Sequence, residues 1–389
     1  MKVLIAGGGI GGLTAALCLA KGGHEVEVFE QASVLTEIGA GIQLSPNCSR
    51  VLHYLGLEDA LRADGFLPDG TQFRDWKSGR VIAESELGPA ALAKFGSPYY
   101  HIHRGDLLAL LVNAAAQSDA IRLHTSSRLE GYEEKGGSVW VAANDAKFQG
   151  DVLVGADGIH SKIREALWGV EKPTFTGNVA WRAMVPASAI PEGMVRPMST
   201  AWWGPARHFV HYYVKGGAFV NCVCVVEKEG WAVESWTERG EYEELRGDFE
   251  DWHQDIQTLI DAADRDSLYK WALYDRPPMK VWGKGRVTLL GDSCHPTLPF
   301  MAQGAAMAIE DGAVLASCLS QDLKVPEALK KYEDLRRVRT AGIQNGSRRN
   351  ARLFHLSGIK AWLRNKAVNK ASRGAMDRLF GYNALDAAQ

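Results

Sequence analysis

The first thirty residues constrain the fold of this chain more than any other stretch. A short apolar run, Lys2–Ala6, predicts a strand, and the alternating segment Glu25–Phe29 predicts a second one. Between them stand three glycines with the spacing G-x-G-x-x-G: Gly7, Gly9 and Gly12. An apolar segment with helical spacing, Leu13–Ala20, follows the glycines. The order strand, glycine turn, helix, strand predicts a βαβ unit of a parallel sheet.

Each glycine of this turn has its own physical role. Gly7 permits the tight turn, Gly9 lets a ligand approach the backbone, and Gly12 allows the helix to pack closely on the strand. The helix N-terminus offers N–H groups and a partial positive charge to phosphates. Glu30 closes the second strand, where an acid would accept hydrogen bonds from a ribose. The stretch predicts a binding site for an adenine dinucleotide and does not distinguish NAD from FAD. The alternative is a glycine-rich turn in an ordinary α/β unit that binds no ligand.

Composition narrows the class of protein. A length of 389 residues indicates two domains or one large domain with an inserted sheet. The net charge of −2 argues against nucleic acid as a partner. Glycines interrupt the N-terminal apolar run, so we expect neither a signal peptide nor a stable membrane association. The six cysteines are scattered without a C-x-x-C pair, which favours a reducing cytoplasm and no metal site.

The middle of the chain has a different pattern. From Phe175 to Val226, β-branched and aromatic residues alternate, which predicts an antiparallel sheet inserted between two α/β parts. The predicted fold class is therefore α/β, with a Rossmann-like domain, an inserted antiparallel sheet and C-terminal helices. The expected domains are residues 1–174 and 270–325 for the dinucleotide, 175–269 for the substrate, and 326–389 as a helical segment.

Two further glycine–acid pairs follow apolar strands. Asp157 comes after the strand Asp151–Gly155, and Asp292 after Arg286–Leu290. Ligands bind at the carboxyl ends of such strands, although Asp157 or Ser161 would equally cap the next helix. A helix predicted from Gly304 offers the N–H groups of Gly304 and Ala305 to a developing anion.

Arg104 stands at the start of another predicted helix, Leu107–Ala116. A cation is disfavoured at a helix N-terminus, and this mismatch favours a ligand role for Arg104 over a solvated helix end.

Together these motifs resemble those of FAD-dependent aromatic hydroxylases of the para-hydroxybenzoate hydroxylase type. The resemblance runs from Met1 to about Arg349 and rests on the glycine turn, Asp157-Gly158, and Gly291-Asp292 with the following His-Pro. The stretches AGIQLSPN, HRGDL, GADGIHSKIRE and LLGDSCHPTLPFMAQGAAMAIEDG are most similar to salicylate hydroxylases and 6-hydroxynicotinate 3-monooxygenases. The 3-hydroxybenzoate 6-hydroxylases come third.

The resemblance implies a set of FAD-binding residues. The ADP half of FAD would lie on Gly7, Gly9, Gly12 and Glu30. Arg104 would lie along the pyrophosphate, and Asp292 would bind the ribityl chain. Asp157 would face the cofactor from a loop that also serves the nicotinamide nucleotide. The amides of Gly304 and Ala305 would meet the flavin N1–C2 edge.

The resemblance also implies a reaction. NADH or NADPH reduces FAD, O2 adds to give a flavin C4a-hydroperoxide, and a hydroxylated aromatic acid is hydroxylated, with or without decarboxylation. His208 and Tyr212 are the candidate catalytic residues for the substrate hydroxyl. The alternative is that both are packed sheet residues. A register shifted by one would put His211 and Tyr213 there instead.

The expected substrate pocket is lined by Gln43, on the loop Gln31–Pro46, and by Pro299 and Phe300. Gln43 and Phe300 stand where the hydroxynicotinate enzymes have histidine, which favours salicylate or a related hydroxybenzoate. No arginine for a carboxylate is evident on the strand of His208, and His295 is expected to support its own loop.

Two other classes remain open at this point. The chain is alternatively another FAD-dependent oxidoreductase of the same fold, such as a reductase, epoxidase or halogenase, or a flavin-binding sensor without turnover. Trp181 is followed by Arg-Ala-Met-Val-Pro186 with no second tryptophan, which weakens the halogenase alternative. The basic C-terminal helices are expected to be a solvated face, and a homodimer contact there is the alternative.

Overall fold

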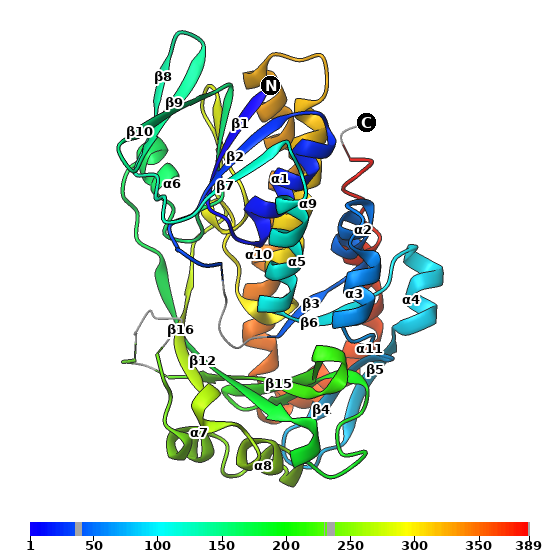
Figure 1. The fold of residues 1–389 in the computed structure, drawn as a ribbon. Helices are drawn as coiled ribbons and strands as arrows, with labels where there is room; N and C mark the ends of the chain where they lie inside the picture. The colour runs from blue at the N-terminus through cyan, green and yellow to red at the C-terminus, as the bar shows by residue number, and fades with distance from the viewer. Residues whose placement is uncertain (36–40, 229, 232–237, 388–389) are drawn as a thin grey trace.

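The computed structural model describes residues 1–35, 41–228, 230–231 and 238–387. Two large sheets lie at opposite ends of the molecule, with long helices running between them (Figure 1). The upper sheet in Figure 1 carries the N-terminal strands, and the lower sheet carries the middle of the chain. The predicted fold class is confirmed.

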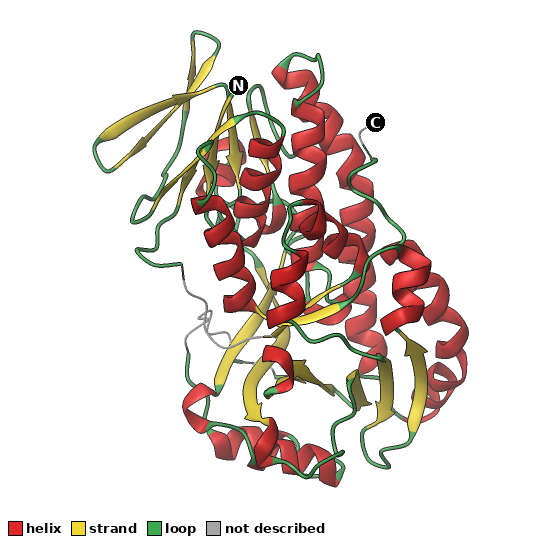
Figure 2. Cartoon of the chain, turned by 45° about the vertical axis from the view of Figure 1, so that its right-hand side comes forward, coloured by secondary structure: helices red, strands yellow, loops and turns green. Residues whose placement is uncertain are grey.

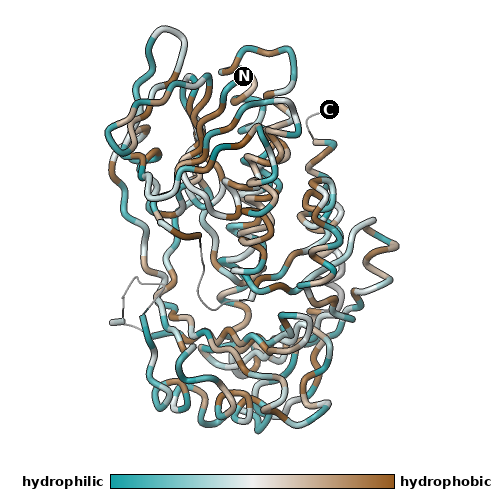
Figure 3. Tube along the Cα trace, in the orientation of Figure 1, coloured by the Kyte–Doolittle hydropathy of each residue, from teal (hydrophilic) through white to brown (hydrophobic). Residues whose placement is uncertain are grey.

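The upper sheet is parallel. Its strands, in order across the sheet, are β17 (Val287–Leu289), β11 (Val152–Gly155), β1 (Lys2–Ala6), β2 (Glu25–Phe29) and β7 (Ile121–His124). Strands β1 and β11 are almost entirely buried, as expected for a parallel sheet covered on both faces, and Figure 3 shows their hydrophobic character.

Helices and a small meander cover this sheet. The helices are α1 (Ile10–Lys21), α5 (Arg104–Ala116) and α9 (Gly304–Leu319), and α1 packs on both others. The meander consists of β8 (Glu133–Lys135), β9 (Ser138–Ala143) and β10 (Ala146–Gly150), and it contacts β1 and β11. Its residues join the same hydrophobic core as the helices, so the first domain has one continuous core.

The turn between β1 and α1 explains two of its glycines. Gly7 has φ +104°, and a Cβ there would lie 2.3 Å from the carbonyl oxygen of Ala156. A Cβ on Gly12 would lie 2.0 Å from the carbonyl oxygen of Gly7. Both positions therefore require glycine, as the sequence predicts.

The remaining elements of the first two-thirds of the chain, and the 3-10 helices, are short. Residues expected as loop form β3 (Gly41–Leu44), which pairs with β6 (Tyr100–His103), while residues 36–40 of that loop lie outside the described part of the chain. The shorter helices are α2 (Pro46–Tyr54), α3 (Glu58–Asp64), α4 (Gly88–Phe95) and α6 (Lys162–Trp168). The 3-10 helices are η1 (Ala187–Ala189), η2 (Lys215–Gly217), η3 (Arg265–Ser267), η4 (Gly291–Ser293) and η5 (Pro299–Met301).

The lower sheet has seven strands. In order they are β16 (Tyr269–Asp275), β12 (Thr174–Pro186), β15 (Phe219–Glu227), β14 (Arg207–Val214), β13 (Met198–Gly204), β4 (Gly70–Asp75) and β5 (Val81–Glu86). All neighbours are antiparallel except β13 and β4. The sheet thus takes β4 and β5 from the sequence range expected for the first domain, whose boundaries stay a prediction.

The two faces of this sheet differ, as period-two alternation requires. One face packs against α7 (Tyr242–Asp248) and α8 (Gln254–Asp261) through residues such as Trp181 and Phe209, and Figure 2 shows these helices below the sheet. The opposite face carries His208, Val210, Tyr212 and Val214 toward the rest of the molecule. The predicted register of this strand is confirmed. A turn at Phe249–His253 separates α7 from α8.

Two helices complete the chain. Helix α10 (Val325–Phe354) runs from the upper core to the lower sheet, and α11 (Gly358–Phe380) turns back along α2 and β5. Within the described residues, none of the helices combines the length and the hydropathy needed to cross a membrane.

Candidate active site

The turn after β1 and the end of β2 form one end of the site. A Cβ built on Gly9 meets no atom within 4 Å, so this glycine borders open space at the start of α1. Glu30 accepts hydrogen bonds from the backbone N–H groups of Gly8 and Ala32, each at 2.8 Å. The carboxylate is thus held beside the glycine turn with lone pairs left for ribose hydroxyls. Gly9, the helix start and Glu30 fit the adenosine diphosphate part of a dinucleotide.

Arg104 and Asp292 lie near each other although they are far apart in sequence. Arg104 is the first residue of α5, and Asp292 lies in η4 directly after β17. Enclosure by the protein raises the pKa of the Asp292 carboxyl, and the positive charges of His295 and Arg104 partly oppose this. The side chain of Asp292 is nevertheless exposed, so it faces open space rather than a packed core. The pair offers a cation for a pyrophosphate and an acceptor for sugar-like hydroxyls.

Asp157 uses its carboxylate at the start of α6. It accepts hydrogen bonds from the Ser161 hydroxyl at 2.5 Å and from the Lys162 N–H at 2.6 Å. Ser161 itself caps the helix by accepting from the Arg164 N–H at 2.9 Å. The side chain therefore has the capping role that the sequence also allowed. Its backbone lies beside the glycine turn, because a Cβ on Gly7 would come within 3.0 Å of the Asp157 Cα.

Helix α9 begins at Gly304, as the sequence predicts, so Gly304 and Ala305 supply its first N–H groups. The preceding Gln303 is buried and anchors this helix start. Its side chain donates to the Ser45 hydroxyl at 2.9 Å and accepts from the Asn47 amide at 3.1 Å. The sequence did not identify Gln303 and Asn47 as a pair, because the two residues lie 256 positions apart in the chain.

The face of β14 meets β3 around Tyr212. A Cβ on Gly41 would lie 2.8 Å from Tyr212 Cε2, and the Gly41 N–H donates to the Asn221 side chain at 2.7 Å. Gln43 accepts a hydrogen bond from the Tyr99 hydroxyl at 2.6 Å. Burial raises the pKa of Tyr212, while the charge of Arg182 and a hydrogen bond with Gln43 lower it in part. Tyr212 is therefore a neutral hydroxyl that bonds within a polar cluster.

His208 lies on the same face but has different neighbours. Its ring centroid is 5.0 Å from that of Phe300, and its Nδ1 is 2.8 Å from Nε2 of His355. His355 follows α10, and its Nδ1 lies 2.7 Å from a carboxylate oxygen of Glu227. Phe300 is buried in η5, whereas Pro299 is exposed. The structure thus brings Phe300 to His208, and it adds His355 and Glu227, which sequence reasoning missed because nothing local connects them to β14.

An arginine from another strand shares this face, although the sequence showed none for a carboxylate on the strand of His208 itself. Arg182 in β12 is level with Val223 in β15 and, through it, with Val210 in β14. Because Val210 lies between His208 and Tyr212 on β14, Arg182 lies two strands away from the midpoint between these two residues and on the same face of the sheet. Its guanidinium is 4.2 Å from the ring centroid of Trp271. In the sequence, Arg182 follows the apolar Trp181, which indicates that the two side chains point to opposite faces of their strand. Placing Arg182 beside His208 and Tyr212 also requires the strand order of the sheet.

His295 supports the loop after β17, as expected. Its Nε2 is 2.6 Å from Oδ2 of Asp311, whose Oδ1 accepts from Arg336 at 2.7 Å. Burial alone raises the pKa of Asp311, but the charges of His295 and Arg336 and their hydrogen bonds outweigh it and hold the pKa at about 2. Asp311 also accepts from the Gly291 N–H at 3.1 Å, which fixes the backbone next to Asp292.

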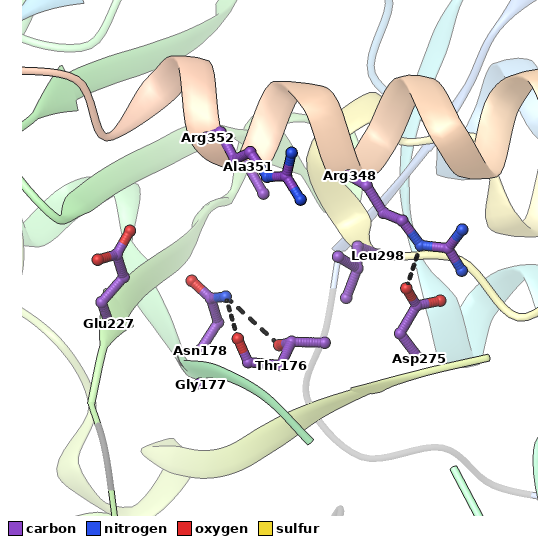
Figure 4. A pocket seen from close by; sticks show the side chains of 9 residues that line it. All are labelled: Thr176, Gly177, Asn178, Glu227, Asp275, Leu298, Arg348, Ala351 and Arg352. Atoms are coloured by element: carbon purple, nitrogen blue, oxygen red, sulfur yellow. Dashed lines mark hydrogen bonds and ion pairs between the residues drawn. The ribbon is translucent and has the colours of Figure 1, made fainter. Parts of the chain in front are cut away.

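A pocket of about 360 Å³ lies between the lower sheet and α10 (Figure 4). It is lined by Thr176, Gly177, Asn178, Glu227, Asp275, Leu298, Arg348, Ala351 and Arg352. Glu227 stands at one end, and the ion pair of Arg348 with Asp275, at 2.5 Å, stands at the other. The pocket does not include Tyr212 or Gln43, so it is a space beside the candidate site and not the predicted substrate pocket.

The chain is similar to known proteins over most of its length. Residues 1–346 match the family described as FAD binding domain. The chain is 40% identical over 325 residues to 6-hydroxynicotinate 3-monooxygenase of Pseudomonas fluorescens, covering 82% of this chain and 83% of that protein. It is 37% identical to 3-hydroxybenzoate 6-hydroxylase of Polaromonas naphthalenivorans, covering 98% of this chain and 96% of that protein.

A solved salicylate hydroxylase in complex with its substrate has the same fold. The TM-score is 0.84 at 24% identity, with 100% of this chain and 97% of that chain covered.

Proposed function

Because this chain belongs to the FAD binding domain family and is a flavin-dependent aromatic monooxygenase, we propose that its substrate is a hydroxybenzoate or a close heteroaromatic analogue. The protein uses FAD, NAD(P)H and O2. The observation that carries the substrate proposal is the single sheet face that combines Arg182, Tyr212 and His208. These groups suit a carboxylate, a ring hydroxyl and its proton.

Bound FAD supplies the hydride acceptor and the oxygen activation that amino-acid side chains lack. The residues that would hold it are Gly7, Gly9, Gly12, Glu30, Arg104, Asp157, Asp292, Gly304 and Ala305. Gly9 and Glu30 support the adenosine end through the open space at Gly9 and the fixed carboxylate. The start of α9 supports the flavin end, since its bare N–H groups favour a negative charge.

The substrate groups would meet residues of the lower sheet. Arg182 would bind the carboxylate with a charge-assisted hydrogen bond. Tyr212 would hydrogen-bond the ring hydroxyl, and His208 would accept its proton. Gln43, Pro299 and Phe300 would line the ring. These roles fix the ring relative to the cofactor and exclude water, which are the protein's contributions to this chemistry.

Gln43 and Phe300 favour a benzenoid ring over a pyridine. Both are less basic than the histidines that the sequence resemblance places there, so a ring nitrogen finds fewer partners. We therefore propose salicylate or a related hydroxybenzoate as the preferred substrate, with 6-hydroxynicotinate as the next candidate. The buried, unpaired state of all six cysteines supports the reducing cytoplasm as the place of action.

The experiment is a substrate panel with the purified FAD-loaded protein. Oxidation of NADH and of NADPH is followed with salicylate, 3-hydroxybenzoate, 4-hydroxybenzoate and 6-hydroxynicotinate, with product and CO2 analysis. We expect one hydroxybenzoate to accelerate NAD(P)H oxidation and to yield a hydroxylated product. Preference for 6-hydroxynicotinate would overturn the benzenoid assignment. Oxidation without any aromatic product would indicate a reductase instead.

A further inference from the structure

A chain of three side chains leads from the sheet face to the surface. Nδ1 of His208 in β14 lies 2.8 Å from Nε2 of His355, and Nδ1 of His355 lies 2.7 Å from Oε1 of Glu227 at the end of β15. The three residues come from two neighbouring strands and from the end of α10. Both distances are those of direct hydrogen bonds, so the chain is continuous.

The carboxylate of Glu227 determines which ring nitrogens of His355 and His208 carry protons. A carboxylate only accepts hydrogen bonds, so Nδ1 of His355 must carry a proton and its Nε2 must be the acceptor when the ring is neutral. His208 must then donate from Nδ1, which leaves the lone pair on its Nε2. Among the described residues, no group bonds to that Nε2. Glu227 therefore prepares His208 to accept a proton on its remaining nitrogen, and the logic is that of an acid orienting a histidine base.

Burial prevents the proton from staying on His208. The ring is 3% exposed and packs against Phe300 and Phe354. Burial lowers the pKa of His208 well below its ordinary value, and His355 lowers it further. A base in such surroundings works best when it passes its proton on at once.

The other end of the chain is in contact with solvent. The side chain of Glu227 is 52% exposed and lines the pocket of about 360 Å³, where Figure 4 shows it beside Asn178. The charged groups acting on His355 are Glu227 from β15 and Arg364 from α11. Burial lowers the pKa of His355, Glu227 raises it and Arg364 lowers it, so this ring also rests neutral and transmits a proton without storing one.

We propose that His208, His355 and Glu227 form a proton relay that carries the proton of the substrate hydroxyl to the pocket beside α10. The O–H bond of the substrate breaks, its electron pair stays on oxygen, and the proton binds Nε2 of His208. The proton on Nδ1 of His208 moves to Nε2 of His355, and the proton on Nδ1 of His355 moves to Glu227, which releases it to water. The reverse sequence returns a proton to the product. This relay rests on the proposed function, because it requires a substrate with an ionisable hydroxyl.

Within the relay, His355 and Glu227 are positioning residues. The test must distinguish this role from a purely structural one. The same hydrogen bonds attach the end of α10 to the lower sheet, so their loss would also loosen this contact. The test therefore needs a readout of proton position and a readout of proton transfer, in addition to turnover.

The first measurement is ¹⁵N NMR of the wild-type holoenzyme with labelled histidine, assigned with His208→Gln and His355→Gln. We expect a protonated Nδ1 and an unprotonated Nε2 in both His208 and His355. We also expect Glu227→Gln to remove this tautomer preference in His355. A proton on Nε2 of His208 at rest would overturn the relay, whatever the substrate is.

The second measurement is stopped-flow absorbance of phenolate formation when the oxidised holoenzyme is mixed with the aromatic acid of the panel that the wild-type protein hydroxylates. His355→Gln and Glu227→Gln should slow ionisation by about 100-fold, the lower range for a general base, with FAD content unchanged. The matched control is Glu84→Gln, an exposed acid of the same sheet that pairs with Arg196 and should leave the rate unchanged.

The outcomes separate the two proposals. If the wild-type protein hydroxylates an aromatic acid but the relay variants ionise it as fast as Glu84→Gln does, the relay is wrong and the proposed function stands. If no aromatic acid is hydroxylated, the proposed function is wrong, and the tautomers measured by NMR still decide whether the hydrogen-bonded chain is set as described.

Discussion

At the scale of single residues, the candidate site is made of polar groups that are buried but have defined partners. Tyr212 lies against the backbone of Gly41, His208 is bonded to His355, and Arg182 lies over Trp271. Such groups keep fixed positions because a buried polar atom without a partner is costly. A substrate would therefore meet a prearranged set of donors and acceptors.

Arg182 provides the sharpest prediction at this scale. Arg182→Gln should raise the dissociation constant of the preferred hydroxybenzoate by about 10- to 100-fold, because a hydrogen bond to a charged group contributes about 1.5–3 kcal/mol. The measurement is a titration of the flavin absorbance of the holoenzyme. The matched control is the corresponding phenol without the carboxylate, whose binding should not change. Equal weakening of both ligands would contradict a role for Arg182 in binding the carboxylate.

Two glycines of the same turn should respond differently to a methyl group. Gly12→Ala places a Cβ 2.0 Å from a backbone oxygen and should prevent normal folding. Gly9→Ala has open space for its Cβ, so the protein should fold but bind FAD at least about tenfold more weakly, by steric exclusion of the phosphates. Circular dichroism reports folding, and flavin fluorescence reports binding. A Gly9→Ala protein with normal FAD affinity would be inconsistent with a phosphate at this turn.

The sequence predicted those site residues whose role depends on local order. The glycine turn, the start of α9 at Gly304 and the alternation of His208 and Tyr212 all follow from spacing along one segment. Arg182, His355 and Glu227 could not be found in this way. Their relation to β14 depends on strand order and on the path of α10, which are set by packing between distant segments.

At the scale of elements, a buried network of charges joins three helices. Arg336 of α10 bonds to Glu310 and Asp311 of α9, each at 2.7 Å, and Asn47 of α2 donates to Glu310 at 2.6 Å. These three charged side chains have no exposed surface. The network holds α9, whose first N–H groups border the candidate flavin site, against α2 and α10.

Breaking this network should be costly. Arg336→Met removes one buried cation from two buried carboxylates. Because Glu310 keeps Arg339 and Asp311 keeps His295, the loss in unfolding free energy should be roughly 3 kcal/mol. Urea denaturation of the holoenzyme measures it. The matched control is Lys330→Met on the same helix; the Lys330 side chain is exposed, so its ion pairs should contribute less than about 1 kcal/mol. A similar small effect of both substitutions would mean that Arg336 is dispensable.

The elements themselves were predicted to different degrees. The strands and helices of the βαβ unit and the four central strands of the lower sheet agree with their sequence patterns. The strand β3 was expected as loop because its four residues form a strand only by pairing with β6. Likewise, the place of β4 and β5 beside β13 is a tertiary contact without a local signal.

At the scale of the whole molecule, the candidate cofactor residues span the space between two sheets. Glu30 lies at the end of a parallel strand, and Gly304 starts the helix that leads away from the site near the lower sheet. A ligand that touches both ends would connect the two halves of the protein. Its binding energy therefore contributes to the stability of the entire fold.

Removal of FAD should lower the thermal stability accordingly. Free FAD at 100 times its dissociation constant should add about 2.7 kcal/mol to the unfolding free energy of the apoprotein. Differential scanning calorimetry at increasing FAD concentration measures this, with riboflavin as the matched ligand that lacks the adenosine diphosphate part. If riboflavin stabilised the protein as much as FAD does, the glycine turn and Glu30 would have no part in binding.

A flavin-dependent aromatic monooxygenase transfers one atom of O2 to its aromatic substrate. The most direct measurement is mass spectrometry of the product formed by the holoenzyme with NADH, the preferred hydroxybenzoate and ¹⁸O2 in ordinary water. We expect one ¹⁸O atom in each product molecule. A product without the label, or NADH oxidation that yields only hydrogen peroxide, would contradict it.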